Sequence, residues 1–536
     1  MTVATRYMDE LRSRPTDAPS RPPFAADVVL ALAGAVLVAH LLTNAFSPYG
    51  VHRDEFLYMA MGRHLRLFRM DFPPFIAIVA EVSRMFGDSL VVLRFAPALA
   101  GAALVVLAAL LAREFGGGRY AQLLAAAAVA TVPLYLRTGN LFQPVVFDQL
   151  WWTLALFALT RLGREGFRGD ARWWLVLGVA GGFGLLTKFS IAFIGAGVLV
   201  ALLLGAGRRA LLGPWPWVAL AIALAIGSPS VVGQVRLGFP VVAQMHDLQG
   251  SQLEHVSYAS FFTGQLFMLG PAFVIAAIGL GALLVARRAR AFRAVGWACA
   301  TAFVIVMLLH GKPYYVGPIY PALIGAGAAA IGAWAERARA AHRASLAVIV
   351  QAAAVVLVVA YGALSLPLGL PIVPPAPMAR YAATLGVTAA VKNNQGEVLS
   401  LPQDYADMLG WEAQVAAVAR VYRALPDSDR SRVVILAENY GEAGAIDYYG
   451  PKYGLPSAVA PTGSYWFFGP GTKPGDVIIK VGGDRNDLTP YFRSVEVAAR
   501  VSEPWVVPEE RDLSIWICRQ PYRTLQALWP RFEGQN

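Results

Sequence analysis

The chain has 536 residues, of which 57% are hydrophobic and only 15% are charged. Soluble proteins carry about 25% charged residues, so this composition excludes a soluble globular enzyme and a disordered chain. Two cysteines in a chain of this length exclude a disulfide scaffold. With a mean hydropathy of +0.52, the sequence instead predicts a polytopic α-helical membrane protein.

The net charge of +11 is divided unevenly along the chain. Residues 1–379 hold 29 Lys and Arg against 16 Asp and Glu, a balance of +13, whereas residues 380–536 hold 16 against 18, a balance of −2. The two parts are therefore expected to differ in solvent exposure. Basic loops between apolar runs account for such a surplus, so we expect contact with membrane lipids and no nucleic-acid partner.

The first 26 residues are polar and rich in arginine, and they predict a cytoplasmic tail. Residues 27–366 carry a series of apolar runs that predicts about eleven transmembrane helices. The runs lie at about 27–46, 89–112, 121–136, 145–160, 173–187, 189–204, 216–232, 261–286, 295–309, 316–335 and 345–366. The 173–204 stretch admits either one long helix or a hairpin around Lys188.

The arginines predict the orientation in the membrane. With the N-terminus in the cytoplasm, 19 of the 29 cations before residue 380 fall in inner segments, as the positive-inside rule requires. This distribution favours the hairpin at Lys188, because one long helix there would move Arg287–Arg293 to the outer side. An odd number of spans in the inner cell membrane then places the C-terminal part outside the cytoplasm.

Residues 367–379 are rich in proline and predict a stiff linker. Residues 380–536 have the composition of a soluble, extracytoplasmic domain. The runs 433–437 and 477–481 predict buried strands, and 405–422 predicts a helix. This alternation is typical of a small α/β domain.

The first outer loop, about residues 47–88, contains the consecutive residues His52, Arg53, Asp54 and Glu55. A carboxylate partly removed from water at a membrane interface can act as a general base for a hydroxyl group. The same loop could also lie solvated on lipid headgroups, and the residues alone leave both interpretations open. Residues 59–68 of the loop are compatible with an amphipathic interfacial helix.

Three further ionisable residues stand near the outer ends of predicted spans. Asp148 begins a span, a position that is costly unless the carboxylate faces a polar cavity or reaches the interface. Lys188 and Lys312 are the two lysines before residue 380, and both fall on the outer side. An anionic ligand such as a phosphate would explain them, as would snorkelling to the interface. The histidines and acids of 233–260 match no known metal spacing, so we expect no metal requirement.

Five short motifs follow one another on the same predicted side of the membrane. They are Asp54-Glu55, Asp71-Phe-Pro-Pro74, Phe147-Asp148, Leu186-Thr-Lys188 and Gly311-Lys-Pro-Tyr-Tyr-Val-Gly-Pro-Ile-Tyr-Pro321. In this order, over residues 27–340, they resemble the GT-C membrane glycosyltransferases, in particular the protein O-mannosyltransferases and the aminoarabinose transferases of lipid A (glycosyltransferase families 39 and 83). Residues 437–446 resemble the outer domain of bacterial members of this superfamily.

The resemblance implies a catalytic GT-C domain over residues 27–366 that takes a sugar from a polyprenyl-phosphate donor on the extracytoplasmic face, with inversion. It implies that Asp54 is the catalytic base and that Glu55 and Asp148 accompany it. Lys188, Lys312 and, as a further candidate, Arg137 would hold the donor phosphate, whose growing charge cations stabilise. The residues implied to line the substrate site are His52, Arg53, Asp71, His310, Tyr314 and Tyr315. The acceptor would be an envelope glycan, lipid or protein, and no cofactor is implied.

The sequence departs from the aminoarabinose transferases at Phe72, which stands where those enzymes have a lysine before the paired prolines. One phosphate ligand is thereby removed, so the resemblance does not secure lipid A as the acceptor. Two other classes of function stay open: a transporter or flippase of lipid-linked sugars, and a scaffold that binds a partner through its outer domain. Within that domain, Glu438–Tyr440 and Tyr465–Phe468 could form an acceptor or glycan site or belong to ordinary packing.

Overall fold

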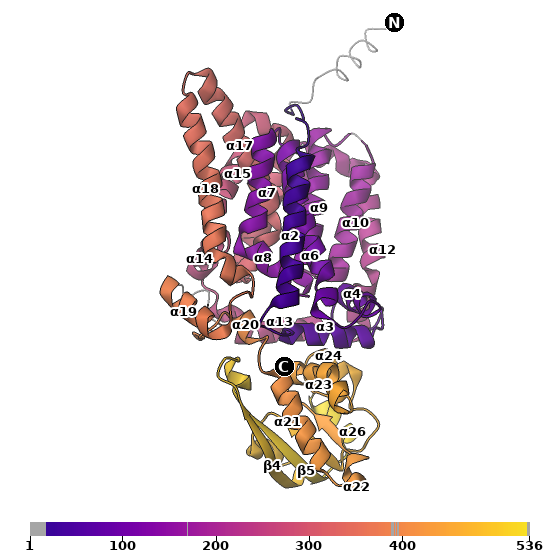
Figure 1. Cartoon of the computed structure of the whole chain (residues 1–536). Coiled ribbons are helices and arrows are strands. Elements are labelled where there is room, and N and C mark those ends of the chain that lie inside the picture. Colours follow the sequence, from indigo (N-terminus) through magenta and orange to yellow (C-terminus); the bar gives the residue numbers. More distant parts are fainter. Residues whose placement is uncertain (1–17, 169, 387–390, 392, 394–395, 533–536) are drawn as a thin grey trace.

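The computed structural model describes residues 18–168, 170–386, 391, 393 and 396–532. It consists of a bundle of long helices with a small α/β domain at one end, and the described part of the chain begins at the other end (Figure 1). Most of the predicted cytoplasmic tail, residues 1–17, falls outside the described residues.

Seven helical segments are long and apolar enough to cross a membrane, judged by length and composition. They are α2 (Ala26–Phe46), α6 (Phe95–Glu114), α9 (Pro144–Arg164), α12 (Trp215–Arg236), Arg287–Leu308 with α16 (Arg293–Leu308), Pro313–Ala340 with α17 (Tyr320–Ala340), and α18 (Ala344–Gly369). The described part of the chain therefore confirms a polytopic helical membrane protein.

Two further spans are broken. Helices α7 (Arg119–Thr131) and α8 (Pro133–Asn140) meet at 58°, and α14 (Tyr258–Leu269) and α15 (Pro271–Val285) meet at 109°. A proline begins the second helix of each pair, where its missing N–H costs least. Counting each pair as one span gives nine.

The 173–204 stretch is a hairpin of two shorter apolar helices, α10 (Arg172–Thr187) and α11 (Ile191–Leu204). Lys188 separates them in an extended conformation with φ −163° and ψ 138°. After α11 the chain is back at the end of the bundle where α10 begins, since Gly207 after α11 packs against the ring of Phe167 before α10. One long helix is therefore excluded. These two helices coincide with two predicted spans, although the total of eleven stays a prediction.

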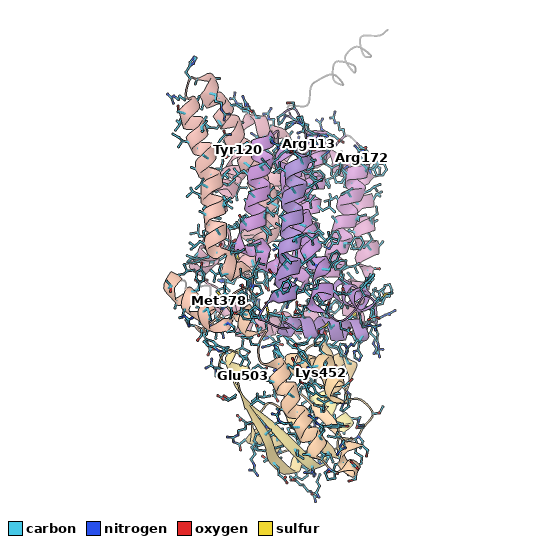
Figure 2. The ribbon with its side chains drawn as sticks, in the orientation of Figure 1. Arg113, Tyr120, Arg172, Met378, Lys452 and Glu503 are labelled. Atoms are coloured by element: carbon cyan, nitrogen blue, oxygen red, sulfur yellow. The ribbon has the colours of Figure 1, made fainter. Side chains whose placement is uncertain are left out.

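The arginine-rich connections gather at the N-terminal end of the bundle. Arg113 Nε donates to the carbonyl of Pro22 at 2.9 Å, and Arg164 Nη1 donates to that of Pro19 at 2.7 Å. Figure 2 shows Arg113 and Arg172 at this end, far from Lys452 and Glu503 in the α/β domain. The described parts of the segments predicted to be inner thus lie at one end, and the first loop and the C-terminal domain lie at the other.

Several short helices lie across the end that carries the α/β domain (Figure 1). They are α3 (Arg53–Arg63), α4 (Phe75–Arg84), α13 (Pro240–Ser251), α19 (Pro375–Leu385) and α20 (Gln403–Ala406), and the one-turn helix α5 (Leu90–Leu93) follows α4 in the chain. Helix α3 begins six residues earlier than the predicted interfacial helix at 59–68, because His52 caps it and Glu55 completes a capping box. Helix α18 runs through Pro367 to Gly369, so helix occupies part of the predicted linker.

The C-terminal domain is built on a five-stranded sheet with the order β2-β1-β3-β5-β4. The strands are β1 (Val434–Leu436), β2 (Ala458–Val459), β3 (Val477–Val481), β4 (Phe492–Ser502) and β5 (Asp512–Pro521). Strands β2, β1 and β3 are parallel, and β5 and β4 are antiparallel. The α/β class and both predicted strands are confirmed.

Helices complete the C-terminal domain. They are α21 (Trp411–Ala424), α22 (Asp427–Arg430), α23 (Tyr440–Tyr449), α24 (Ser464–Phe468), α25 (Arg485–Leu488) and α26 (Leu525–Leu528). The single helix predicted over 405–422 is wrong. It is split into α20, which ends at Ala406, and α21, which begins after Gly410, whose φ of +82° lies outside the helical region.

A buried ion pair joins the first outer loop to the bundle. Glu55 of α3 accepts hydrogen bonds from Nε and Nη2 of Arg94, both at 2.7 Å, and both side chains are 0% exposed. The backbone N–H groups of His52 and Phe142 also donate to Glu55, at 2.8 and 2.7 Å. These bonds lower the pKa of Glu55 although burial opposes them, so the carboxylate stays charged and fixes α3 in place.

Replacing Arg94 with methionine should destabilise the fold. Glu55 would keep a buried charge without its counterion, which costs about 3–5 kcal/mol. A lower midpoint of thermal unfolding in detergent would measure this loss. The matched control is Arg119→Met, which breaks an exposed pair with Asp27 and should change the midpoint little; equal midpoints for the two variants would contradict the proposed anchor.

Candidate active site

A cavity of about 650 Å³ lies where the helical bundle meets the C-terminal domain. The first outer loop contributes His52, Arg53 and Asp54 to its wall, and the segment before α21 contributes Asp404 and Asp407. Apolar side chains from α14 and α18 form another part of the wall, among them Phe267, Met268, Tyr361, Leu364 and Leu368. The cavity thus has a charged part at the loop and an apolar part between membrane helices.

Asp54 is held by two uncharged donors from opposite sides. The hydroxyl of Tyr440 in the C-terminal domain donates to Oδ1 at 2.9 Å, and Nε2 of Gln143 donates to Oδ2 at 3.1 Å. Among the described residues, Asp54 makes no ion pair within 4 Å. Its carboxylate is therefore oriented but not neutralised, and each oxygen keeps a lone pair that can accept a proton.

Four cations line the same cavity, and one of them, Arg53, pairs with Glu509 at 3.0 Å. Lys312 donates from Nζ to Oε1 of Gln252 at 2.6 Å, and Arg137 pairs with Asp404. The Nζ atom of Lys188 lies 4.2 Å from the ring centre of Tyr315 and 5.6 Å from that of Tyr314. Burial lowers the pKa of Lys312, and the charge of Lys188 adds to this effect. An anion between the two lysines would relieve their repulsion.

His52 connects the loop to the C-terminal domain. Its Nδ1 accepts the backbone N–H of Asp54 at 3.1 Å, and its Nε2 lies 3.8 Å from Asp404 and 3.9 Å from Asp407. Burial by itself lowers the pKa of His52, but Asp404, Asp54 and Asp407 outweigh it and raise the value to about 9. A second proton on the ring would break the hydrogen bond that Nδ1 accepts from Asp54. The hydrogen bond therefore favours the neutral ring, whereas the neighbouring carboxylates favour the protonated ring.

His52, Asp404 and Asp407 bring three metal-ligating atoms within 4.8 Å of one another among the described residues. The hydrogen bond at Nδ1 argues against a metal there. An accepting Nδ1 leaves the ring proton on Nε2, whereas a ligating histidine coordinates through one nitrogen and donates a proton from the other. The cluster suits a group of paired charges better than a metal, and the absence of a metal requirement stays a prediction.

Five of the predicted site residues do not line the cavity. Glu55 is locked to Arg94, and Asp148 accepts from Ser190 at 2.8 Å in the buried core. Asp71 accepts from Ser464 of the C-terminal domain at 2.7 Å. His310 is exposed and bonds the carbonyl of Val256 at 2.8 Å, and Tyr315 lies against Lys188 and the ring of Tyr314. The geometry gives Glu55 and Asp71 structural partners, and the proposed substrate contacts of all five stay predictions.

The structure adds four residues that sequence reasoning did not assign to the site: Gln143, Asp404, Asp407 and Tyr440. Tyr440 stood out in the sequence as part of a candidate glycan site. Asp404 and Asp407 carried no signal, because their partners His52 and Arg137 lie some 270 to 350 residues away in the chain. Phe72 lines the cavity where the aminoarabinose transferases have a lysine.

Replacing Asp407 with asparagine should stabilise the protein above pH 6. Burial raises the pKa of Asp407 to about 6 from 3.8, so the folded state binds this proton more tightly than the unfolded state does. The tighter proton binding adds to the free energy of unfolding. This addition is complete below pH 3.8 and is lost as the pH rises through 6. The asparagine carries no such loss, and its advantage above pH 6 should be on the order of 2–3 kcal/mol.

Thermal unfolding of Asp407→Asn and the wild type at pH 4, 6 and 8 measures this difference. The midpoints should nearly agree at pH 4 and separate by pH 6. The exposed Asp427 offers a control, because Asp427→Asn should follow the wild type at every pH. A separation that does not change with pH would contradict the assignment.

Comparison with known proteins identifies the fold. The family described as dolichyl-phosphate-mannose-protein mannosyltransferase matches residues 71–232. No curated protein sequence matches the chain. Solved structures of ArnT from Cupriavidus metallidurans resemble it, in the apo state with a TM-score of 0.58 and 18% identity, and bound to undecaprenyl phosphate with a TM-score of 0.55 and 17% identity. Each comparison covers 92% of this chain and 98% of ArnT.

A more distant resemblance points the same way. The archaeal oligosaccharyltransferase AglB from Archaeoglobus fulgidus, in complex with an inhibitory peptide and a dolichol-phosphate, has a TM-score of 0.52 and 13% identity, over 84% of this chain and 69% of AglB. The resemblance inferred from the five motifs is thereby confirmed at the level of the fold: the chain is a multi-pass membrane protein with the GT-C glycosyltransferase fold and a C-terminal α/β domain.

Proposed function

We propose that the protein is a membrane glycosyltransferase that moves a sugar from a polyprenyl-phosphate donor to a hydroxyl group of an envelope glycan, lipid or protein. The observation that carries this proposal is one cavity in which Asp54 shares the wall with Lys188, Lys312 and Arg137. A carboxylate beside several cations suits a reaction that removes a proton at one end and releases a phosphate at the other.

In this reaction Asp54 takes the proton of the acceptor hydroxyl while the hydroxyl oxygen bonds to the anomeric carbon of the sugar. The bond from that carbon to the phosphate oxygen breaks, and the polyprenyl phosphate leaves with the electron pair. A single displacement of this kind inverts the anomeric configuration. The cations stabilise the charge that grows on the leaving phosphate, so no nucleotide loop and no cofactor is required.

The apolar part of the cavity supports a lipid-linked donor. Phe267 and Met268 on α14 and Leu364 and Leu368 on α18 would contact the isoprenoid chain, while the phosphate reaches the lysines. ArnT, whose structure is similar, has been solved with undecaprenyl phosphate bound. The distribution of arginines further supports a protein of the inner cell membrane whose N-terminus is cytoplasmic and whose catalysis takes place on the outer face.

Replacing Asp54 with asparagine should abolish transfer while leaving the fold intact. Loss of a general base reduces the rate by about 100- to 10,000-fold. The measurement is transfer of label from undecaprenyl-phosphate sugars to acceptors in membrane extracts. Asp88→Asn removes an exposed carboxylate of the same loop and serves as the control. Full activity of the Asp54 variant would refute the proposed base, and movement of the lipid in sealed vesicles without a glycosylated product would favour a flippase.

Replacing Lys188 with methionine should weaken binding of undecaprenyl phosphate by about 10- to 100-fold, because a hydrogen bond between charged groups is lost. Affinity can be followed from the thermal stabilisation that added undecaprenyl phosphate produces. The control is Lys452→Met, an exposed lysine paired with Glu412 in the C-terminal domain. Unchanged affinity in the Lys188 variant would remove this residue from the donor site.

A further inference from the structure

The C-terminal domain contributes one side chain that touches the proposed base. The hydroxyl of Tyr440 donates to Oδ1 of Asp54 at 2.9 Å, and its ring lies under the guanidinium of Arg53 at 5.1 Å. Tyr440 also lines the cavity. The contact spans 386 residues of sequence, so it exists only while the two domains are docked.

Tyr440 is the first residue of α23, and the start of that helix is firmly fixed. Asn439 caps the helix, its side chain accepting from the backbone N–H groups of Gly441 and Glu442, and Glu442 completes a capping box. The amide of Asn439 donates in turn to Glu510 at 2.8 Å. The residue therefore stands on a rigid element, which is the placement a precise contact requires.

Two glycines let α23 lie directly against α3. A Cβ atom on Gly444 would lie 2.4 Å from Cβ of Phe56, and one on Gly441 would lie 2.7 Å from Cγ of Arg53. Any larger residue at either position would clash with α3 unless one of the two helices moved. The close approach of the two helices sets the distance between the Tyr440 hydroxyl and Asp54.

We propose that Tyr440 is a positioning residue for Asp54, so that the C-terminal domain is part of the catalytic centre; this inference rests on the proposed function. Burial and the neighbouring Asp54 raise the pKa of Tyr440 well above its usual value, which keeps the phenol a neutral donor. A neutral donor orients the carboxylate without cancelling the charge that attracts the acceptor proton. Gln143 holds the other oxygen from the membrane side.

Tyr448 provides a matched control for the alternative that Tyr440 only docks the domains. It belongs to the same helix and the same interface, and its hydroxyl donates to the carbonyl of Asp88 at 2.7 Å. A purely structural hydroxyl at Tyr440 would behave as the one at Tyr448 does.

The experiment compares Tyr440→Phe with Tyr448→Phe in the full-length protein, using transfer from an undecaprenyl-phosphate sugar. Tyr440→Phe should lower kcat by about 10- to 100-fold with little change in the KM for the donor, and Tyr448→Phe should retain the wild-type kcat. Gly444→Ala should also lower kcat by moving α23, and adding Tyr440→Phe to it should have little further effect. A wild-type kcat in Tyr440→Phe, or equal losses in both tyrosine variants, would overturn the proposal.

A second measurement needs no substrate. A double-mutant cycle of Asp54→Asn and Tyr440→Phe on the thermal midpoint should show coupling, whereas Asp54→Asn and Tyr448→Phe should be additive. If the wild type transfers no sugar, the proposed function fails. Coupling in the first cycle would still support the positioning of Asp54 by Tyr440, and additivity there would overturn it.

Discussion

The buried pair of Glu55 and Arg94 is the constraint on which the outer end of the molecule depends. Glu55 accepts from two guanidinium nitrogens and two backbone N–H groups, all within 2.8 Å. A buried charge with this set of partners cannot shift without leaving one of them unsatisfied. Helix α3 is thereby fixed against the start of α6, and Asp54, the residue before Glu55, faces the cavity. Of two adjacent carboxylates, one secures the helix and the other remains available for chemistry.

Charge complementarity explains how the C-terminal domain docks onto this fixed helix. The bundle presents His52, Arg53 and Arg137 at its outer end, and the C-terminal part supplies Asp404, Asp407 and Glu509 opposite them. The uneven net charge of the two parts has its structural consequence here. Aromatic packing of Phe56 against Trp411 and Tyr449 adds a buried apolar contact between the two domains.

Patterns that are local in sequence predicted much of this structure. Apolar runs gave the bundle, arginines gave the common end of the inner segments, and the two β-rich runs became β1 and β3. Asp54, Lys188, Lys312 and Arg137 were assigned to one site from resemblance, and they do line one cavity. The contacts of Asp404 and Tyr440 could not be predicted, because they depend on how two separately patterned domains dock. The break between α20 and α21 was missed because the apolar pattern continues across Gly410, whose left-handed backbone lies between the two helices.

The cations of the cavity differ in the charge that they can offer to an anion. Arg137 pairs with Asp404, so part of its charge is already compensated, and Phe72 supplies none. Lys188 makes no ion pair within 4 Å among the described residues and instead faces the rings of Tyr314 and Tyr315. An aromatic face attracts a cation without accepting its protons, which leaves the ammonium hydrogens for a ligand. Under the proposed function, Lys188 at the turn between α10 and α11 is therefore better prepared for a phosphate than Arg137 is.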